Sequence, residues 1–287
     1  MTRVTETAGG IARREKFRGA GAIPGVVVLM AVFVAPLLFM LWRSFSEPTL
    51  GLQHYAAVFT DRTSLVIILR TLEVSVIVAV VTVLLAYPYA YLMTIATPSW
   101  RTVLTLIVLI PFWTSLMART FAWYVLFQSN GPLDHLFESL HLGGLNILGS
   151  AVAVTIGMAQ VIMPFAVFPL YSTMQGIDRT LLQAAQGLGA RRHVAFARIY
   201  LPLSRPGIIS SWFLVFVLSL GFYVTPQILG SSHNALLSQY IAIKIGDQLD
   251  FGFGSALAVV LVIVTGVILG ALGGAAKVGS GATIERV

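Results

Sequence analysis

The chain has 287 residues, of which 57% are hydrophobic and 10% charged, and its mean hydropathy is +0.88. Soluble domains carry about 25% charged residues, so this composition excludes an ordinary soluble protein and indicates a membrane protein. The sequence has no cysteine, which excludes disulfides and thiolate chemistry. A net charge of +7 is also typical of nucleic-acid binding. Here, however, the positive charges lie between apolar runs, where they set membrane topology.

Residues 1–20 are basic and poor in apolar side chains, which predicts a cytoplasmic N-terminal tail. The run Ile23–Trp42 is too long for a signal-peptide core and lacks a small-residue cleavage site, so it predicts a first membrane span. Five further runs have about the 20 residues that a 30 Å hydrocarbon core requires. They are Thr71–Met93, Val103–Phe127, Leu148–Tyr171, Ile208–Leu229 and Phe253–Leu272. The sequence therefore predicts an all-α polytopic membrane protein with six transmembrane helices in residues 21–275, followed by a cytoplasmic tail, 276–287.

Lysine and arginine predict the orientation of these spans. Thirteen of them fall on the side that holds both tails and the loop 172–207. Only three, Arg43, Arg62 and Lys244, fall in the loops on the other side, apart from Arg70 at the edge of the second span. Because cytoplasmic loops carry an excess of positive charge, both termini and the loop 172–207 are predicted to be cytoplasmic.

The segment 178–209 is a polar, basic island between apolar runs. Asp178 is expected to cap a short helix whose apolar residues share one face. These residues are Leu181, Ala184, Ala185 and Leu188. Gly189 is expected to end this helix in a left-handed conformation, and Pro202 and Pro206 stop a second, arginine-rich helix. Two short helices joined by a glycine turn, apolar on one face and cationic on another, predict a plug for a groove in another protein.

This segment resembles the EAA loop of the membrane permease subunits of binding-protein-dependent ABC importers. The matching positions are Gln183, Ala184, Ala185, Gly189, Ile199, Leu201 and Pro202. The resemblance implies a coupling loop, 176–207, that docks on a cytoplasmic ATPase subunit. The residues expected to couple are Gln183, Ala184, Ala185, Leu188, Gly189, Arg191, Ile199 and Pro202. Gln183 stands where the family usually has glutamate, and an ordinary amphipathic loop is the alternative interpretation.

Two other stretches, 111–123 and 221–230, resemble the permeases of the spermidine/putrescine type, a group that includes relatives for opines and other small amines. The resemblance implies a type I ABC importer permease fold in the bacterial inner membrane and a small, amine-containing cargo such as a polyamine or an opine. Related permeases serve ferric iron and other cargo. Ammonium groups are favoured over aromatic rings, and Trp113, Trp123, Phe222 and Tyr223 supply such rings. Core packing is the alternative role for all four.

Two ionisable residues fall within the predicted spans, where a charge is expensive and tends to face a cavity or a partner. Arg119 lies midway along the third span and Glu73 near the outer end of the second, close to Arg70. Both are candidates for lining a translocation path, and Arg119 would repel a cation there. The alternative for both is a structural ion pair or a side chain that reaches the interface.

The sequence has no phosphate-binding G-x-x-x-x-G-K-[ST] loop and no metal-ligand cluster, so it predicts a transport subunit rather than an enzyme. The resemblance implies that ATP and Mg²⁺ are bound by two partner ATPase subunits, not by this chain. It also implies a second permease, homologous or identical, and an extracytoplasmic substrate-binding protein. An ion-coupled secondary transporter, and a membrane scaffold or lipid-modifying enzyme, are the alternatives from other classes. In the last span Gly266, Gly270 and Gly274 predict close helix packing.

Overall fold

The computed structural model describes residues 23–47, 50–141, 144 and 147–281. The longer helices are α2 (Ile23–Ser46), α4 (Arg62–Ile95), α5 (Pro98–Trp113), α6 (Leu116–Phe127), α8 (Ala151–Gln175), α12 (Arg205–Leu220) and α15 (Phe251–Gly281). The shorter ones are α3 (Gln53–Thr60), α7 (Pro132–Ser139), α9 (Thr180–Gly187), α10 (Arg192–Ala195), η1 (Phe196–Tyr200), α11 (Leu201–Leu203), α13 (Val224–Leu229), η2 (Ser232–Asn234), α14 (Leu237–Ala242) and η3 (Ile243–Asp247). The predicted tail 1–20 and residues 282–287 lie outside the described residues. The described part is all-α, as predicted.

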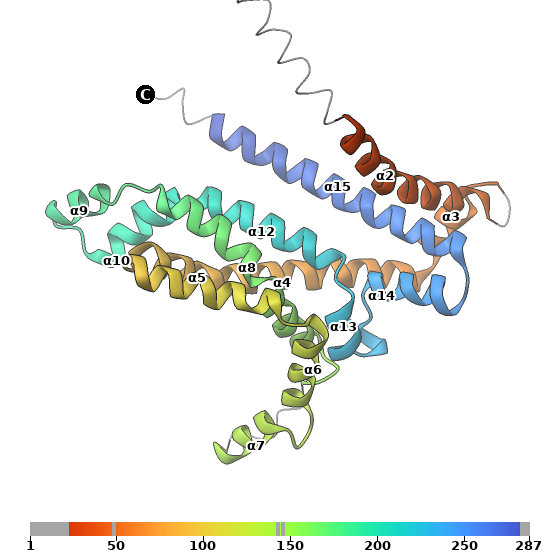
Figure 1. Ribbon diagram of the computed structural model, residues 1–287, viewed down its shortest axis with the longest axis horizontal. Helices are drawn as coiled ribbons and strands as arrows, with labels where there is room; N and C mark the ends of the chain where they lie inside the picture. The colour runs from red at the N-terminus through yellow and green to blue at the C-terminus, as the bar shows by residue number, and fades with distance from the viewer. Residues whose placement is uncertain (1–22, 48–49, 142–143, 145–146, 282–287) are drawn as a thin grey trace, which may run out of the picture.

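Helices α4, α8 and α12 pack together as the centre of the molecule, with α5 beside α4 and α8 (Figure 1). Small residues let these helices approach closely. A Cβ added at Gly207 of α12 would lie 2.8 Å from the Cβ of Thr173 on α8. Nearby, Ser211 Oγ donates a hydrogen bond to the carbonyl of Ala166 on α8 at 3.0 Å. In a membrane such close packing and hydrogen bonding, rather than the hydrophobic effect, hold helices together.

The helices that are long and apolar enough to cross a membrane reach the predicted number of six only when bent helices are counted as single spans. Within the described ranges four are unbroken: α2, α4, α8 and α15. The other two are bent pairs. Pro98–Trp113 meets Leu116–Ser139 at 96°, and Arg192–Leu203 meets Arg205–Leu220 at 59°.

The third predicted span, Val103–Phe127, was expected to be continuous and is not. Helix α5 ends in a break at Thr114 and Ser115, whose ψ angles of 145° and 130° are not helical. Pro111 has no backbone N–H to continue the helical ladder. The Ser115 hydroxyl accepts a hydrogen bond from the N–H of Ala118, which begins α6 in a new direction. Apolarity predicted the membrane location of this segment but not its change of direction.

The second and fifth predicted spans also differ in extent from the helices. Helix α4 begins before Thr71, because Asp61 caps it by accepting hydrogen bonds from the N–H groups of Thr63 and Ser64. Its 34 residues span about 51 Å, well beyond a hydrocarbon core of about 30 Å. The fifth span, predicted as Ile208–Leu229, is interrupted after Leu220, and α13 then continues as a separate short helix.

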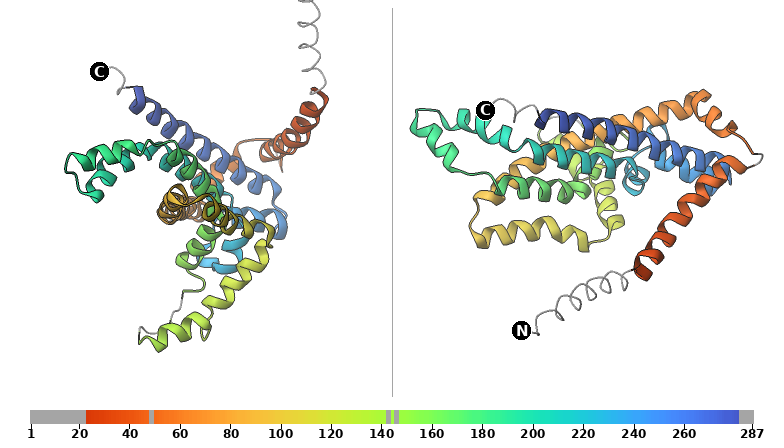
Figure 2. Two further views of the ribbon diagram at one scale, coloured as in Figure 1. Left: turned by 60° about the vertical axis from the view of Figure 1, so that its left-hand side comes forward. Right: turned by 90° about the horizontal axis from the view of Figure 1, so that it is seen from above.

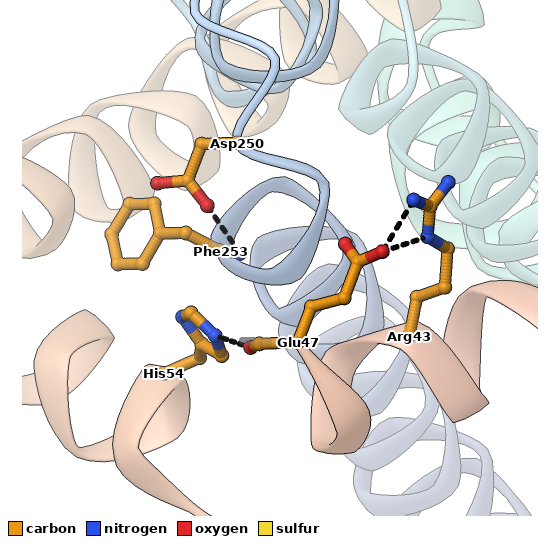
Figure 3. Close-up of polar contacts among 5 residues, drawn as sticks. All are labelled: Arg43, Glu47, His54, Asp250 and Phe253. Atoms are coloured by element: carbon orange, nitrogen blue, oxygen red, sulfur yellow. Dashed lines mark hydrogen bonds and ion pairs between the residues drawn. The ribbon is translucent and has the colours of Figure 1, made fainter. Parts of the chain in front are cut away.

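Helix α2 is attached to the rest of the molecule at a corner with the start of α15 (Figure 3). Arg43 forms an ion pair with Glu47, and its guanidinium carbon lies 4.2 Å from the centre of the Phe251 ring. His54 Nε2 hydrogen-bonds the backbone carbonyl of Glu47. Gly252 leaves room for this contact, since a Cβ there would lie 2.8 Å from that carbonyl oxygen. These contacts bind α2, α3 and α15 to one another at the end of the bundle opposite α9 (Figure 1).

Away from this corner α2 diverges from the bundle (Figure 2). None of its most apolar 18-residue window is buried. The predicted packing of the glycines in α15 does not occur within the described chain, because a Cβ at Gly266 or Gly270 would meet nothing within 4 Å. The third glycine of that pattern, Gly274, lies beyond the part of α15 whose side chains are described.

Candidate functional site

The segment 178–209 adopts the predicted helix–glycine–helix geometry. Asp178 accepts hydrogen bonds from the backbone N–H and the hydroxyl of Thr180, at 2.9 and 2.8 Å, at the start of α9. The backbone bond and then the hydroxyl bond hold the pKa of Asp178 below its usual value. Helix α9 therefore begins two residues after Asp178, whose side chain bonds its first residue, while Arg179 occupies the N-cap position without a side-chain cap.

Gly189 ends α9 with a φ of +89°, the left-handed conformation expected of it. Its N–H bonds the carbonyl of Gln186 at 2.9 Å, and the N–H of Ala190 bonds the carbonyl of Ala185 at 3.0 Å. This pair of bonds is the Schellman motif, which satisfies the last carbonyls of a helix and turns the chain sharply. The turn sets the direction of the following helix, α10.

Helix α9 buries none of its side chains against the rest of the molecule. Leu188, which follows it, is 90% exposed, and Leu181 and Ala184 on the predicted apolar face are also exposed. Gln183 is exposed and Ala185 is half-buried. The surface formed by Leu181, Ala184 and Leu188 is called the α9 apolar face below. These three side chains form an exposed apolar surface, while Leu182, on another side of α9, packs against the core.

The second helix of the segment presents the predicted cationic surface. Arg191, Arg192 and Arg198 are exposed, and none of them forms an ion pair with another described residue. Ile199 and Pro202 are half-buried and lie where this helix returns to the bundle. Apart from the half-buried Ala185, the predicted coupling residues are thus exposed on and just after α9 and half-buried near α11.

An aromatic cluster fixes this segment to the C-terminal part of α4. Phe196 and Tyr200, one helical turn apart, stack with ring centres 5.3 Å apart. The Tyr91 ring of α4 meets both edge-on, at 5.4 Å from Phe196 and 5.2 Å from Tyr200. Tyr87, one turn earlier on α4, meets the Phe196 ring edge-on at 6.3 Å. Such pairs contribute about 0.5–1.5 kcal/mol each beyond the area they bury.

Polar contacts reinforce the same junction. The hydroxyls of Tyr87 and Ser204 lie 2.9 Å apart, and Arg179 donates a hydrogen bond to the backbone carbonyl of Thr94. Phe196–Tyr200 forms a π-helical turn, η1. Such turns change which side chains face a neighbour, and they are frequent at functional sites. The segment therefore joins α4 at several points and leaves the α9 apolar face exposed.

The sequence analysis did not predict this aromatic cluster. Its only sequence signal is two aromatic pairs at helical i, i+4 spacing, Tyr87 with Tyr91 and Phe196 with Tyr200. Nothing in that spacing shows that the two pairs meet, because more than 100 residues separate them.

The structure brings together the elements that hold most of the predicted path residues. Arg119 and Trp123 lie on α6, which packs against α13, and Thr120 and Thr225 lie at this contact with their hydroxyls 3.4 Å apart. Phe222 and Tyr223 directly precede α13. Trp113 lies at the end of α5 and is 77% exposed.

The alternative role of core packing applies to part of this aromatic set. The Trp123 ring stacks on Phe127 with centres 5.0 Å apart, and both Trp123 and Phe222 pack against the buried core. Tyr223 and Trp113 are exposed instead. Of the four rings, these two are free to contact another molecule.

Glu73 and Arg119 do not form the structural ion pair that the sequence left open. Among the described residues, neither takes part in any ion pair. Glu73 is exposed on α4, while Arg119 is half-buried and its Nε has no hydrogen-bond partner. Arg70, one turn before Glu73, donates a hydrogen bond to the backbone carbonyl of His233. The described residues also contain no group of three or more metal-ligating side chains.

The sequence of this chain is similar to those of known membrane transport proteins. No protein-family model matches the chain. The spermidine/putrescine transport system permease protein PotB of Escherichia coli (strain K12) is 30% identical over 230 residues, which cover 79% of this chain and 82% of that protein. This chain belongs to the spermidine/putrescine-type family of ABC transporter permeases. PotB of Haemophilus influenzae is 28% identical to this permease over 249 residues, or 86% of this chain and 85% of that protein.

Solved structures agree with this permease in fold. Two chains of a bacterial ABC transporter that imports the acidic polysaccharide alginate match it with TM-scores of 0.68 and 0.73. The matches cover 92% of this chain at 16% and 17% identity, and therefore concern the fold. The inner membrane ABC transporter permease protein YdcU of E. coli is 28% identical over 69% of this chain. The chain is thus a multi-pass transport subunit of the inner membrane with an ABC importer permease fold, and not an enzyme.

Proposed function

We propose that this permease forms half of the translocation path of an ATP-driven importer and couples that path to cytoplasmic ATPase subunits through the segment 176–207. The observation that carries the coupling role is the α9 apolar face, an exposed surface held out from the bundle by a junction that is itself rigid. Its neighbours Arg191, Arg192 and Arg198 add positive charge. A surface of this kind fits a groove with an apolar floor and acidic rim.

In this proposal the ATPase subunits bind ATP and Mg²⁺, and this chain binds neither. Closure of the two ATPases moves the two coupling segments as rigid bodies, and the path changes between inward- and outward-facing states. The path residues are expected to be Trp113, Arg119, Trp123, Phe222 and Tyr223. Both termini and the coupling segment are placed in the cytoplasm, because the positive charges concentrate on that side.

The partners follow from the type of transporter. A second permease is expected to complete the path, and a homologous one has a precedent, since the permease protein PotC of E. coli is 33% identical to this chain over 105 residues. One of the alginate transporter structures is a complex with a periplasmic protein that holds the cargo. An equivalent binding protein is expected to dock on the surface opposite α9, where α3, α14 and the start of α15 lie (Figure 1).

The cargo is proposed to be a small solute with protonated amines, of the polyamine or opine class. Relatives that are 28–30% identical are named for spermidine and putrescine. The charge of the outer surface fits a cation, since seven of the eleven acidic residues lie at or beyond the outer part of the bundle in this topology. They are Glu47, Asp61, Glu73, Asp134, Glu138, Asp247 and Asp250. Clustered charge of one sign raises the local concentration of the opposite charge and speeds its association.

Reconstitution into liposomes tests this function. The permease with its partner permease, ATPase subunits and binding protein is expected to take up radiolabelled spermidine only when ATP is present on the side of the coupling segment. The competing function, an ion-coupled secondary transporter, predicts uptake by the permease alone, driven by a proton or sodium gradient. Gradient-driven uptake without ATPase subunits would refute the proposal.

A further inference from the structure

Glu73 is the only carboxylate in the helices that make up the membrane domain: α2, α4, α5, α6, α8, α12 and α15. It lies on the exposed face of α4, in line with Leu69, Val80 and Leu84, which are 65%, 42% and 67% exposed. These residues recur at helical spacing, so the carboxylate interrupts an otherwise apolar stripe. A charged group at this position is expensive against lipid and tends to face a cavity or a partner.

Three of the cations near the outer end of the bundle are engaged elsewhere, and the fourth, Arg62, lies eleven residues before Glu73 on α4. Arg70, the closest in sequence, bonds the backbone carbonyl of His233. Arg43 pairs with Glu47, and the Lys244 ammonium lies 5.3 Å from the centre of the Tyr240 ring and 5.1 Å from that of Phe253. Within the described ranges Glu73 therefore has no cationic partner.

The position of Glu73 along α4 places it at the outer mouth of the bundle. Just before Glu73, α4 contacts the start of α14. The Thr71 hydroxyl accepts a hydrogen bond from the N–H of Leu237, the first residue of α14, at 2.8 Å. Ile95 lies 22 residues after Glu73, or about 33 Å along the helix, which is close to the thickness of a hydrocarbon core. Glu73 thus lies where a solute from outside first reaches membrane depth.

We propose that Glu73 is a cargo-binding residue that receives a protonated amine as it enters the path. This inference rests on the proposed amine cargo and assigns one side chain to its recognition. The carboxylate accepts charge-assisted hydrogen bonds from the ammonium group, and the apolar stripe around it excludes competing water. An uncharged solute of the same size gains no such bond and is selected against.

The test uses the complete importer in proteoliposomes, with spermidine as the probe. Glu73→Gln keeps the shape of the side chain and removes its charge, while Glu73→Asp keeps the charge. Glu138→Gln, an exposed outer carboxylate on α7, is the matched control. We expect Glu73→Gln to lower the uptake efficiency at least about tenfold. A change of this size corresponds to the loss of one hydrogen bond to a charged group. Glu73→Asp is expected to retain most of the uptake, and so is Glu138→Gln, which removes one negative charge from the outer surface but no proposed contact with the cargo.

Two further measurements separate cargo binding from other roles. The basal ATPase rate of Glu73→Gln and its co-purification with the partner permease are expected to match those of the unsubstituted importer. Loss of the partner permease would overturn the inference, because Glu73 would then hold the assembly together. Spermidine uptake equal to that of Glu138→Gln would overturn it and leave the importer function intact. If the unsubstituted importer hydrolyses ATP but imports no amine, the proposed cargo fails, and the inference fails with it.

Discussion

Gly189 determines the geometry of the coupling segment through its backbone. Its φ of +89° lies in the left-handed region, where a side chain meets the neighbouring carbonyl. Space is not the constraint, because a Cβ at Gly189 would contact nothing within 4 Å. Gly187, two residues earlier, also has open space around it but is helical. Comparing Gly187 with Gly189 therefore separates the effect of a left-handed backbone from the effect of a missing side chain.

Gly189→Val is expected to uncouple transport from ATP hydrolysis. A β-branched residue costs about 1–2 kcal/mol or more in the left-handed region, so the turn opens and the α9 apolar face points elsewhere. The measurements are spermidine uptake in vesicles and co-purification of the ATPase subunits, and both are expected to fall sharply while membrane insertion stays normal. Gly187→Ala is the control and is expected to leave both unchanged. Normal uptake and normal co-purification in Gly189→Val would refute the docking role.

Residues that act through local backbone geometry could be predicted from the sequence, and residues that act through distant contacts could not. Asp178 and Gly189 were predicted because capping and left-handed turns depend on neighbours within a few positions. The contacts of Tyr91 with Phe196 and Tyr200 depend on how α4 and the coupling segment meet. No periodicity within either segment contains that information.

At the scale of elements, the coupling segment has one rigid end and one free end. Phe196–Tyr200 and Ser204 are attached to α4 by ring contacts and a hydroxyl contact, whereas α9 buries none of its residues and leaves its apolar face exposed. In the proposed function, a force that an ATPase applies to α9 would therefore reach α4 through this aromatic junction. The junction and the docking surface can be disabled separately.

Tyr200→Ala is expected to separate ATPase binding from transport. Removing a buried aromatic side chain costs about 3–5 kcal/mol and leaves a cavity at the junction, so the segment loosens from α4. Co-purification of the ATPase subunits and their ATP hydrolysis should remain, because the α9 apolar face is unchanged, while uptake should fall several-fold. Tyr200→Phe keeps the ring and should behave as the unsubstituted protein. An equal loss of ATPase binding and uptake in Tyr200→Ala would contradict this division of roles.

The elements themselves could be predicted in part. Long apolar runs gave the location of every membrane helix, because hydropathy reports the lipid environment directly. The predicted ends and directions of these helices were wrong where a single local contact determines them. Asp61 begins α4 ahead of its apolar run, and the break at Thr114 and Ser115 redirects the third span by 96°. Apolar residues continue across that break, so the hydropathy pattern does not change there.

At the scale of the whole molecule, the two ends of the bundle have different surfaces. The α9 apolar face and the exposed arginines lie at one end, and the corner of α2, α3 and α15 lies at the other (Figure 1). The importer function requires the first end to face the cytoplasm. The absence of cysteine in the chain makes this orientation directly measurable.

Single cysteines at Leu188 and Glu138 are expected to label from opposite sides of the membrane. In spheroplasts a membrane-impermeant maleimide should react with Glu138→Cys and reach Leu188→Cys only after permeabilisation. Both side chains are exposed, so burial does not limit either reaction. The unsubstituted protein provides a background without thiols. Labelling of Leu188→Cys from outside intact spheroplasts would place the coupling segment on the wrong side and end the importer interpretation.

Helix α4 connects these two surfaces without interruption. Tyr87 and Tyr91 bind the coupling segment near one end, and Thr71 bonds the backbone of Leu237 near the other. Pro88 is its only position without a backbone N–H, so it is the natural hinge if the rod bends. Otherwise a tilt imposed on the end that holds Tyr87 and Tyr91 reaches the end that holds Thr71 as the same tilt, and at the same moment. In the proposed function, closure of the ATPase subunits and entry of the cargo would then be a single mechanical event rather than two successive steps.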